Sequence, residues 1–333
     1  MPEPGLVIIG RNEGDRLRRC LESARAHAAV TIYVDSGSTD GSVALARSIN
    51  VEVVELDPAT PFTAARARNA GVERLLQLAP AAQFVQFVDG DCEIQPGWWS
   101  PAAARLVERP ELAVVCGRRR ERHPEASVYN RMCDLEWDTP VGDTTECGGD
   151  AMMRLAAFQS VGGFDPTLIA GEEPELCLRL RQKGYKIERL AVEMTLHDAA
   201  ITTVGQWWRR ENRSGYAFAE SAHRFGHTPE RFRVRWVRRN WFWGIVLPLL
   251  AILPAWWTRG WSLVLLLAYP IQWLKLYRSG RNVRRLTPAD ARLYATFVLL
   301  AKFPQLAGQL KYLRSRLTRR PSALIEYKAS GAT

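Results

Sequence analysis

The sequence predicts an α/β domain built on a mostly parallel, doubly wound sheet, followed by a helical region of different character. Short apolar runs alternate with helical patterns over the first half of the chain, and several of these runs end in polar or acidic residues. A strongly apolar region flanked by arginines appears only after residue 240. The 333 residues are enough for about two domains.

The first half supplies strands and helices in alternation. Apolar side chains at helical spacing mark one face of the first expected helix. Strands are expected at residues 6–9, 30–34, 51–56, 84–88 and 113–116, and helices at residues 15–27 and 63–78. Ser38 or Thr39 is expected to cap the helix after the second strand. Trp98 and Trp99 are expected to start a helix and to pack in the core.

Residues 84–88 form the strand around which the chain is organised. Apolar side chains outnumber the one interruption, Gln86, so both faces of this strand should be buried. The strand ends in Asp89-Gly90-Asp91, where glycine permits a sharp turn between two carboxylates. An acidic turn alone is a common feature. Open α/β sheets, however, bind ligands at this edge, and paired carboxylates hold a hard divalent cation that also takes phosphate oxygens.

The charge and the cysteines limit the class of protein. The net charge of +10 is concentrated on arginines in residues 209–239 and 278–285, on either side of the apolar region. This arrangement fits a membrane surface better than a nucleic-acid groove, so no nucleic-acid partner is expected. The six cysteines form no CxxC pair, which predicts buried thiols in a reducing compartment rather than a disulfide framework or a metal site. A strand begins almost at once without a signal peptide, so the globular part is expected in the cytoplasm.

Several short motifs occur in a fixed order along this predicted sheet. They are NE after the first strand, VDSGSTDGS after the second, ARNAG before the central strand and VDGD at its end. With GGFDPTLIAGEEPELCLRLRQKGYK further on, this set resembles family 2 glycosyltransferases with the Rossmann-like GT-A fold over residues 5–215. The resemblance implies transfer of a sugar from a nucleotide-diphospho-sugar to an acceptor, with inversion at the anomeric carbon and with Mg²⁺ or Mn²⁺ as cofactor.

The resemblance also implies roles for individual residues. Those expected to bind the nucleotide-sugar are Asn12, Glu13, Asp35, Arg66, Asn69, Asp89 and Gly90. Asp91, together with Asp89 and His197, is expected to hold the metal, which neutralises the diphosphate leaving group. Arg66 and Asn69 are three residues apart and so share a helix face.

Three polar residues in or beside this expected binding site can also be explained by local structure alone, and both explanations stay open. Asp40 fits a helix cap as well as a ligand contact, and Glu13 fits the favourable charge at a helix start. Arg68 fits a solvated helix surface.

Acceptor binding is expected on the later segments. Gly148 and Gly149 permit close approach, and the nearby methionines should pack. The basic run 118–123 fits an acceptor phosphate or a solvated charge cluster equally well. Residues 206–210, QWWRR, partly resemble the QxxRW signature of processive synthases but have Arg210 where that signature has tryptophan, so no processive polymerase is inferred. Arg209 and Arg210 are assigned to the acceptor side, and a helix at a membrane surface explains them equally well.

Glu172 and Glu173 are the candidates for proton transfer. They precede a helix expected to reach about residue 183, and Pro174 fits its first position, which makes Glu173 the cap. The helix dipole favours the ionised carboxylate that a general base requires. The family usually has Glu-Asp here, so Glu173 replaces an aspartate with one methylene more. We expect Glu173 to be the base and Glu172 its acceptor-binding neighbour; the alternative is two acids that only stabilise a helix start.

The apolar region predicts a membrane-inserted hairpin. Residues 241–257 and 261–274 carry no charge, and tryptophans and arginines flank them. We expect an integral protein on the cytoplasmic face of the cell membrane, with full crossing or re-entry left open. The expected domains are a GT-A domain at 1–235, the hairpin at 236–277 and a basic amphipathic region at 278–333 along the membrane.

These patterns together predict a glycosyltransferase of cell-envelope or exopolysaccharide assembly. Its expected partners are membrane lipids and a polyprenyl-linked or saccharide acceptor, the lipid being inferred from location. A nucleotidyltransferase using the same acids is one alternative, although it would need a glycine- and lysine-rich phosphate loop that GRNEGDR lacks. A catalytically idle membrane scaffold is another, and the intact acids argue against it.

Overall fold

The computed structural model describes residues 4–24 and 27–318, which pack as two compact units. Within these described residues, the first unit comprises the chain up to 123 and residues 136–200, and the second comprises 124–135 and 201–318. The units differ in extent from the expected domains, which stay predictions about independently folding parts.

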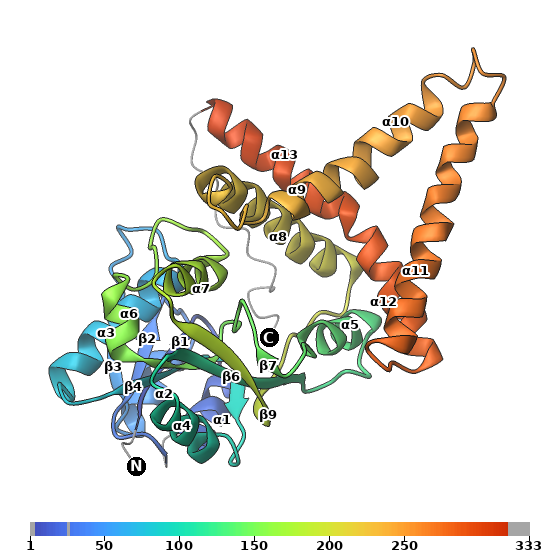
Figure 1. The fold of residues 1–333 in the computed structure, drawn as a ribbon. Coiled ribbons are helices and arrows are strands. Elements are labelled where there is room, and N and C mark those ends of the chain that lie inside the picture. The colour runs from blue at the N-terminus through green and yellow to red at the C-terminus, as the bar shows by residue number, and fades with distance from the viewer. Residues whose placement is uncertain (1–3, 25–26, 319–333) are drawn as a thin grey trace. The chain divides into compact units, whose positions relative to one another are not determined.

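A mixed sheet forms the centre of the first unit (Figure 1). The strands are β1 (Gly5–Gly10), β2 (Thr31–Asp35), β3 (Glu52–Glu55), β4 (Phe84–Asp89), β5 (Cys92–Ile94), β6 (Leu112–Glu121), β7 (Gly142–Asp143), β8 (Ala151–Arg154) and β9 (Lys186–His197). Their order is β3-β2-β1-β4-β8-β6-β9-β5, and β7 pairs with β9.

The strands differ in direction across the sheet. β3, β2, β1 and β4 are parallel, as expected, whereas β8 runs antiparallel between β4 and β6. β5 and β7 also run antiparallel to β9. The prediction of a mostly parallel sheet is right for β1 to β4 and for the parallel pairing of β6 with β9. It missed the antiparallel β5, β7 and β8, because an apolar run indicates a strand but not its direction.

Helices cover both faces of this sheet. They are α1 (Asp15–Ala24), α2 (Ser42–Ser48), α3 (Ala64–Leu78), α4 (Trp99–Glu108), α6 (Leu155–Ser160) and α7 (Glu172–Gln182), while α5 (Val128–Trp137) lies where the chain passes between units. Figure 1 shows α1, α2 and α4 on one face and α3, α6 and α7 on the other. α3 sits close to the sheet at Gly71, where a Cβ atom would lie 2.3 Å from Val7 Cγ1.

Gln86, the polar residue that interrupts the apolar run of β4, has hydrogen-bond partners. Gln86 is fully buried, and its amide accepts a hydrogen bond of 2.8 Å from Trp98 Nε1 and donates one to the Phe87 carbonyl. Trp98 is also fully buried, which confirms its place in the core. The expected cap of α2 is wrong: Gly41 occupies that position without a side-chain hydrogen bond.

The second unit is helical. Its elements after α5 are α8 (Val204–Phe225), α9 (Val234–Trp241), the π-helical turn η2 (Phe242–Val246), α10 (Leu247–Ile252), the 3₁₀ helix η3 (Trp261–Leu267), α11 (Ala268–Asn282), α12 (Pro288–Leu300) and α13 (Lys302–Thr318). α8 and α13 cross so closely that the backbone of one helix contacts the backbone of the other. A Cβ atom on Gly215 would lie 1.9 Å from the Gln305 carbonyl oxygen, and one on Gly308 would lie 1.9 Å from the Asn212 carbonyl oxygen. The crossing therefore requires glycine at both positions.

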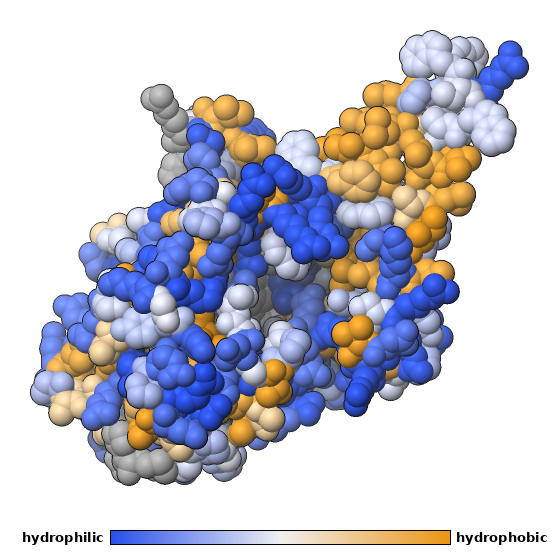
Figure 2. Space-filling model, viewed as in Figure 1, coloured by the Kyte–Doolittle hydropathy of each residue, from blue (hydrophilic) through white to orange (hydrophobic). Residues whose placement is uncertain are grey.

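The membrane prediction for this unit is wrong. In the part of the chain that the structure describes, no helix combines the length and apolarity needed to cross a bilayer. α10 ends at Ile252, Pro254 and a left-handed Gly260 follow, and the second uncharged run starts as a 3₁₀ helix. The uncharged runs 241–257 and 261–274 are thus divided among several helical elements of different type. Figure 2 shows that apolar surface gathers over them.

The C-terminal helix packs within the second unit. α13 contacts α8 through side chains such as Leu306 and Tyr312, 5% and 8% exposed, and the expectation of a basic amphipathic region at 278–333 stays a prediction. Residues 319–333, the end of the expected basic amphipathic region, lie outside the described residues.

Candidate active site

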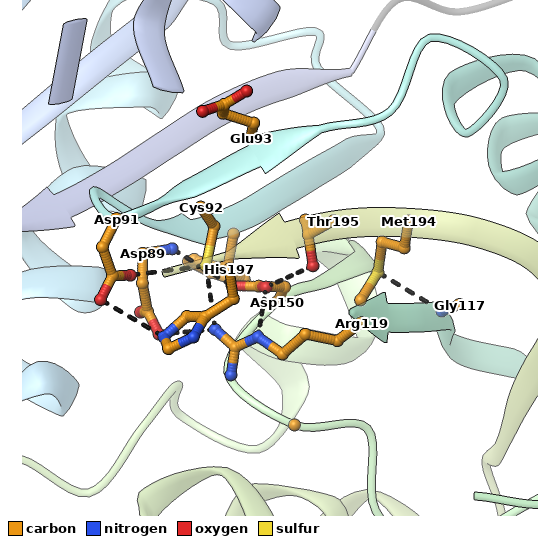
Figure 3. Close-up of polar contacts among 12 residues, drawn as sticks. Asp89, Asp91, Cys92, Glu93, Gly117, Arg119, Asp150, Met194, Thr195 and His197 are labelled. Atoms are coloured by element: carbon orange, nitrogen blue, oxygen red, sulfur yellow. Dashed lines mark hydrogen bonds and ion pairs between the residues drawn. The ribbon is translucent and has the colours of Figure 1, made fainter. Parts of the chain in front are cut away.

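Polar residues from five strands meet at the carboxyl end of β4 (Figure 3). Asp89 ends β4, and its backbone N–H donates to Asp150 Oδ1, which precedes the neighbouring β8, at 3.2 Å. β5 follows Asp91, and its Cys92 pairs in register with His197 at the end of β9. Arg119 arrives from β6. Pairing of the strands thus collects side chains that are far apart in sequence.

Asp89 is held between two arginines. Arg68 Nη2 donates to Asp89 Oδ1 at 2.8 Å, and Arg119 Nη2 donates to Oδ2 at 3.0 Å. Burial alone would raise the pKa of the Asp89 carboxyl, but the two guanidinium charges hold that pKa well below its usual range. Both carboxylate oxygens are therefore engaged by cations within the protein. The expectation that Asp89 binds metal or nucleotide stays a prediction.

Asp91 faces a different partner. Its carboxylate is nearly buried, and Oδ2 lies 3.3 Å from His197 Nε2. The other imidazole nitrogen, Nδ1, lies 3.7 Å from Glu121 Oε2. The Trp137 ring packs edge to face on the imidazole, with 4.8 Å between the ring centroids. Burial and the charge of Arg119 lower the pKa of His197. The imidazole is then neutral near pH 7, which is the form that binds metals.

The Asp91–His197 pair fits a divalent cation. Ligand atoms of Asp91, Cys92 and His197 lie within 4.8 Å of one another. A carboxylate and a neutral imidazole are both ligands of divalent first-row metals. The pairing of distant Asp91 and His197 was expected from sequence.

Asp150 belongs to this cluster although it was not assigned to the site from sequence, and Arg119 was expected only as part of the basic run 118–123. Asp150 is 1% exposed; it accepts a hydrogen bond from Thr195 Oγ1 at 2.7 Å, and its Oδ2 lies 2.9 Å from Arg119 Nε. Arg119 also lies over the Trp137 ring. The sequence signal for Asp150 is the GGD motif, of which only the glycines were expected in the site.

The rest of the basic run is paired with acids. Arg120 binds Glu193, and Arg118 lies 3.5 Å from Asp138. Arg122 pairs with Glu93. β6 continues to Glu121, so alternate side chains of the run point to opposite faces, and of these arginines it is Arg119 that joins the cluster.

The loops after β1 and β2 are tied to each other. Asp35 is 2% exposed and accepts hydrogen bonds from the hydroxyls of Tyr33 and Ser38 and from the N–H groups of Gly37 and Ser38. Asn12, in a left-handed conformation at φ +55°, accepts from the Thr39 N–H at 2.7 Å. These contacts shape a rigid loop pair at the edge of the sheet.

Two acidic residues of these loops have local partners. Glu13 forms an ion pair with Arg16, and Asp40 accepts from the N–H groups of Gly14 and Ser42. A Cβ atom on Gly90 would lie 3.2 Å from the Ile9 carbonyl oxygen, so glycine allows the turn to approach β1 closely.

The residues expected on α3 have structural partners. Arg66 donates to the backbone carbonyls of Asp57 and Thr60, and the Asn69 side chain makes two hydrogen bonds with the Phe164 backbone. Arg68, which the sequence suggested could be a surface residue, is 3% exposed and faces the site. The open alternative for Arg68 is therefore wrong, because its partners Asp89 and Glu172 are distant in sequence.

Glu172 and Glu173 point to different partners. Glu172 Oε1 accepts from Arg68 Nη1 at 2.8 Å. Glu173 Oε1 accepts from the Cys147 N–H at 2.6 Å and lies 3.1 Å and 3.0 Å from Cys147 Sγ and Cys177 Sγ. Burial, with repulsion from Glu146, raises the pKa of Glu173.

The start of α7 differs from the prediction. Gly171, at φ +83°, is the cap, so Glu172 and Glu173 occupy the first two helical positions and Pro174 the third. Proline is tolerated there because the first-turn N–H groups have no partner within the helix.

The acceptor-side candidates lie in both units. Gly149 is close to the cluster, since a Cβ atom there would lie 3.1 Å from Asp89 Oδ2, and Gly148 has φ +84°. Arg209 and Arg210 belong to α8 in the second unit. Gln206 forms a capping box with Thr203, and Trp207 packs on Tyr129 and Phe297 within that unit. Trp207 is thus a core residue.

Comparisons with known proteins agree on one domain. Residues 6–159 match the sequence model of Glycosyl transferase family 2. The pre-mycofactocin glycosyltransferase of Mycobacterium tuberculosis is 27% identical over 221 residues, covering 62% of this chain and 44% of that protein. The succinoglycan biosynthesis protein ExoA of Rhizobium meliloti is 26% identical, covering 55% of this chain and 59% of its own length. The chain thus spans about half the length of these relatives.

Solved structures show the same fold. The mannosyltransferase PcManGT of Pyrobaculum calidifontis, solved with GDP-Man and Mn²⁺, aligns with a TM-score of 0.50 at 18% identity, covering 96% of this chain and 87% of that one. Staphylococcus aureus TarS 1–349 aligns with a TM-score of 0.51 at 13% identity, covering 94% and 92%. At these identities the likeness concerns the fold.

Proposed function

We propose that this chain, whose residues 6–159 form a Glycosyl transferase family 2 domain, transfers a sugar from a nucleotide-diphospho-sugar to an acceptor with inversion. The observation that carries the proposal is the Asp91–His197 pair at the carboxyl end of the sheet, 3.3 Å apart and beside the Arg68–Asp89–Arg119 bridge. Relatives named for succinoglycan biosynthesis and for O-antigen chain rhamnosyl transfer support a saccharide acceptor in envelope or exopolysaccharide assembly.

Donor binding is proposed for the loops at the sheet edge. Asn12, Glu13 and Asp35 would contact the nucleotide, and Gly90 lets the diphosphate approach the β4 turn. Asp91 and His197 would hold the divalent cation, Mg²⁺ or Mn²⁺, which supplies charge neutralisation to the leaving diphosphate. PcManGT, solved with GDP-Man and Mn²⁺, supports this donor and metal class.

The arginine bridge supports the same reaction. Arg68 and Arg119 carry two positive charges within hydrogen-bonding distance of Asp89. Fixed charges at a partly buried site stabilise developing negative charge without having to reorganise. We propose that these guanidinium groups face the diphosphate and that Asp89 fixes their position.

Glu173 is proposed as the general base. Its Oε1 is anchored by the Cys147 N–H, whereas Oε2 receives no hydrogen bond from the described residues and can accept the acceptor's hydroxyl proton. The raised pKa of Glu173 brings its proton affinity closer to neutral pH, which favours general-base catalysis. Glu172 would orient Arg68.

The test is nucleotide release by purified protein presented with a panel of nucleotide-sugars and a saccharide acceptor. We expect release that requires a divalent cation and disappears in Glu173→Gln, while donor binding persists in that variant. Glu172→Gln is the matched control, and it should lower activity less. If Glu172→Gln is inactive while Glu173→Gln turns over normally, Glu172 is the base. If no nucleotide-sugar is consumed with any cation, the proposed function is wrong.

A further inference from the structure

A second group of metal-ligand atoms lies at the start of α7. Cys147 Sγ, Cys177 Sγ and Glu173 Oε1 converge, with 3.7 Å between the sulfur atoms and 3.0–3.1 Å from each sulfur to the carboxylate oxygen. Cys177 and Glu173 are four residues apart on α7 and share a face, while Cys147 comes from the loop before β8. The spacing of the cysteines shows no metal motif, so no metal site was expected there.

The spacing of the sulfur atoms suits a tetrahedral cation. Zinc–thiolate bonds are about 2.3 Å long, so two sulfur atoms 3.7 Å apart subtend an angle of about 107° at the metal. The sulfur–oxygen distances of 3.0–3.1 Å would have to open by about 0.4 Å to reach the same angle. That change is within reach of a carboxylate rotation.

The carboxylate supplies an independent reason for a cation. Glu173 is 7% exposed, and its contacts among the described residues are one backbone N–H and two thiols, with no lysine, arginine or histidine. A buried carboxylate is normally paired with a cation or coordinated to a metal. By contrast, its neighbour Glu172 is paired with Arg68.

We propose that Cys147, Cys177 and Glu173 form a binding site for a thiophilic divalent cation of the Zn²⁺ class, and that occupancy inhibits sugar transfer. Binding displaces the two thiol protons to solvent and forms two metal–sulfur bonds and one metal–oxygen bond. Soft thiolates select Zn²⁺ over Mg²⁺ or Mn²⁺, which prefer oxygen ligands. The half-exposed side chain of Cys147 gives the cation a route from solvent.

The inhibitory part of this inference rests on the proposed role of Glu173. A metal-bound carboxylate is less basic and cannot take the acceptor's proton. The binding part does not rest on that role, because it needs only the three ligand atoms.

Binding is tested without turnover by titrating reduced, metal-free full-length protein with Co²⁺ and recording the thiolate-to-cobalt charge-transfer band. We expect a band that Zn²⁺ displaces. Cys147→Ser and Cys177→Ser should each weaken metal binding by at least about tenfold, since even losing a hydrogen bond that supports a ligand costs about 10–100-fold. Because Cys147 is the more exposed of the two, its variant remains informative if Cys177→Ser misfolds.

Cys92→Ser is the decisive control, because Cys92 lies beside Asp91 and His197 and could bind the probe there. That variant should keep the band. If Cys92→Ser abolishes it while Cys147→Ser and Cys177→Ser retain it, the proposed site is wrong. A reduced wild-type protein that gives no band overturns it as well.

Inhibition is tested by adding Zn²⁺ to the transfer reaction in the presence of saturating Mn²⁺. Measured against the uninhibited rate of the same variant, Cys147→Ser should require more than about tenfold more Zn²⁺ for half-inhibition than the wild type does. If the band assigns Zn²⁺ to this site but turnover is unaffected, regulation of the base is refuted while the metal site stands. If no turnover is found with any donor, the proposed function fails and the cobalt result decides the site alone.

Discussion

Replacing Arg68 with methionine should destabilise the first unit by about 3 kcal/mol. The guanidinium group is 3% exposed and bonds to Asp89 and Glu172 at 2.8 Å each. Methionine retains much of the aliphatic volume but leaves both carboxylates without the cation between them. Removing one partner of a buried ion pair costs about 3–5 kcal/mol. The low end applies because the carboxylates are 30% and 15% exposed and Asp89 keeps Arg119.

Thermal and urea unfolding followed by circular dichroism measure this change. About 3 kcal/mol corresponds to a fall in Tm of roughly 6–12 °C for a unit of this size. Arg66→Met is the matched control, because Arg66 lies on the same helix and binds two backbone carbonyls near the surface. That change should cost about 1 kcal/mol or less.

The pH dependence of stability supplies a second measurement on the same variant. Burial opposes ionisation of Asp89, but Arg68 and Arg119 lower its pKa in the folded protein, so its ionisation stabilises the fold above the unfolded value of about 4. That stabilisation is lost as the pH falls through the folded pKa. Arg68→Met should weaken this acid dependence. An unchanged Tm together with an unchanged acid profile would refute the assignment of Arg68 as a buried bridge.

The other predictions concern the proposed metal ligands, the proposed base and the helix crossing. Asp91→Asn should lose most Mn²⁺ binding in calorimetry while its Tm stays near that of the wild type, because a metal ligand is removed without a change in volume. The pKa read from the acidic limb of the pH profile of kcat/KM should be above the ordinary glutamate value of about 4.3, because burial raises the pKa of Glu173. A pKa at or below that value would contradict the role of Glu173 as base. Gly308→Ala should destabilise the second unit by about 3 kcal/mol or more, measured by limited proteolysis, because the new Cβ would meet backbone atoms. Gly97→Ala, which meets nothing within 4 Å, should not.

The fold and part of the site follow from local patterns in the sequence. Apolar runs and turn residues located β1 to β4, and the Asp-Gly-Asp turn indicated the strand edge where Asp91 meets His197. These features depend on residues close together in sequence and on the general geometry of α/β sheets, so they are visible without coordinates.

The remaining site residues depend on contacts between distant segments. Arg68 looks like a solvated helix residue until Asp89, 21 residues away, and Glu172, 104 residues away, are brought to it. Asn69 has a ligand-binding residue type, but its amide is used by the Phe164 backbone, 95 residues away. The membrane hairpin was wrongly predicted from the length of the uncharged runs. The helix of the first run ends at Ile252, two residues before Pro254, and the second run starts as a 3₁₀ helix after Gly260.

The second unit has a consequence for synthesis of the chain on the ribosome. Its earliest segment, residues 124–135, is bound by residues made much later, as when Arg131 pairs with Asp290, 159 positions further on. At about 5–20 residues per second, that partner emerges on the order of 10–30 s after Arg131. Leu135, which packs with Leu286 and Ala291 in the finished protein, is thus without these partners over that interval. The first unit can complete its sheet earlier, since its last strand ends at His197. A nascent chain stalled between these two points should therefore expose residues 128–135 to chaperones and proteases.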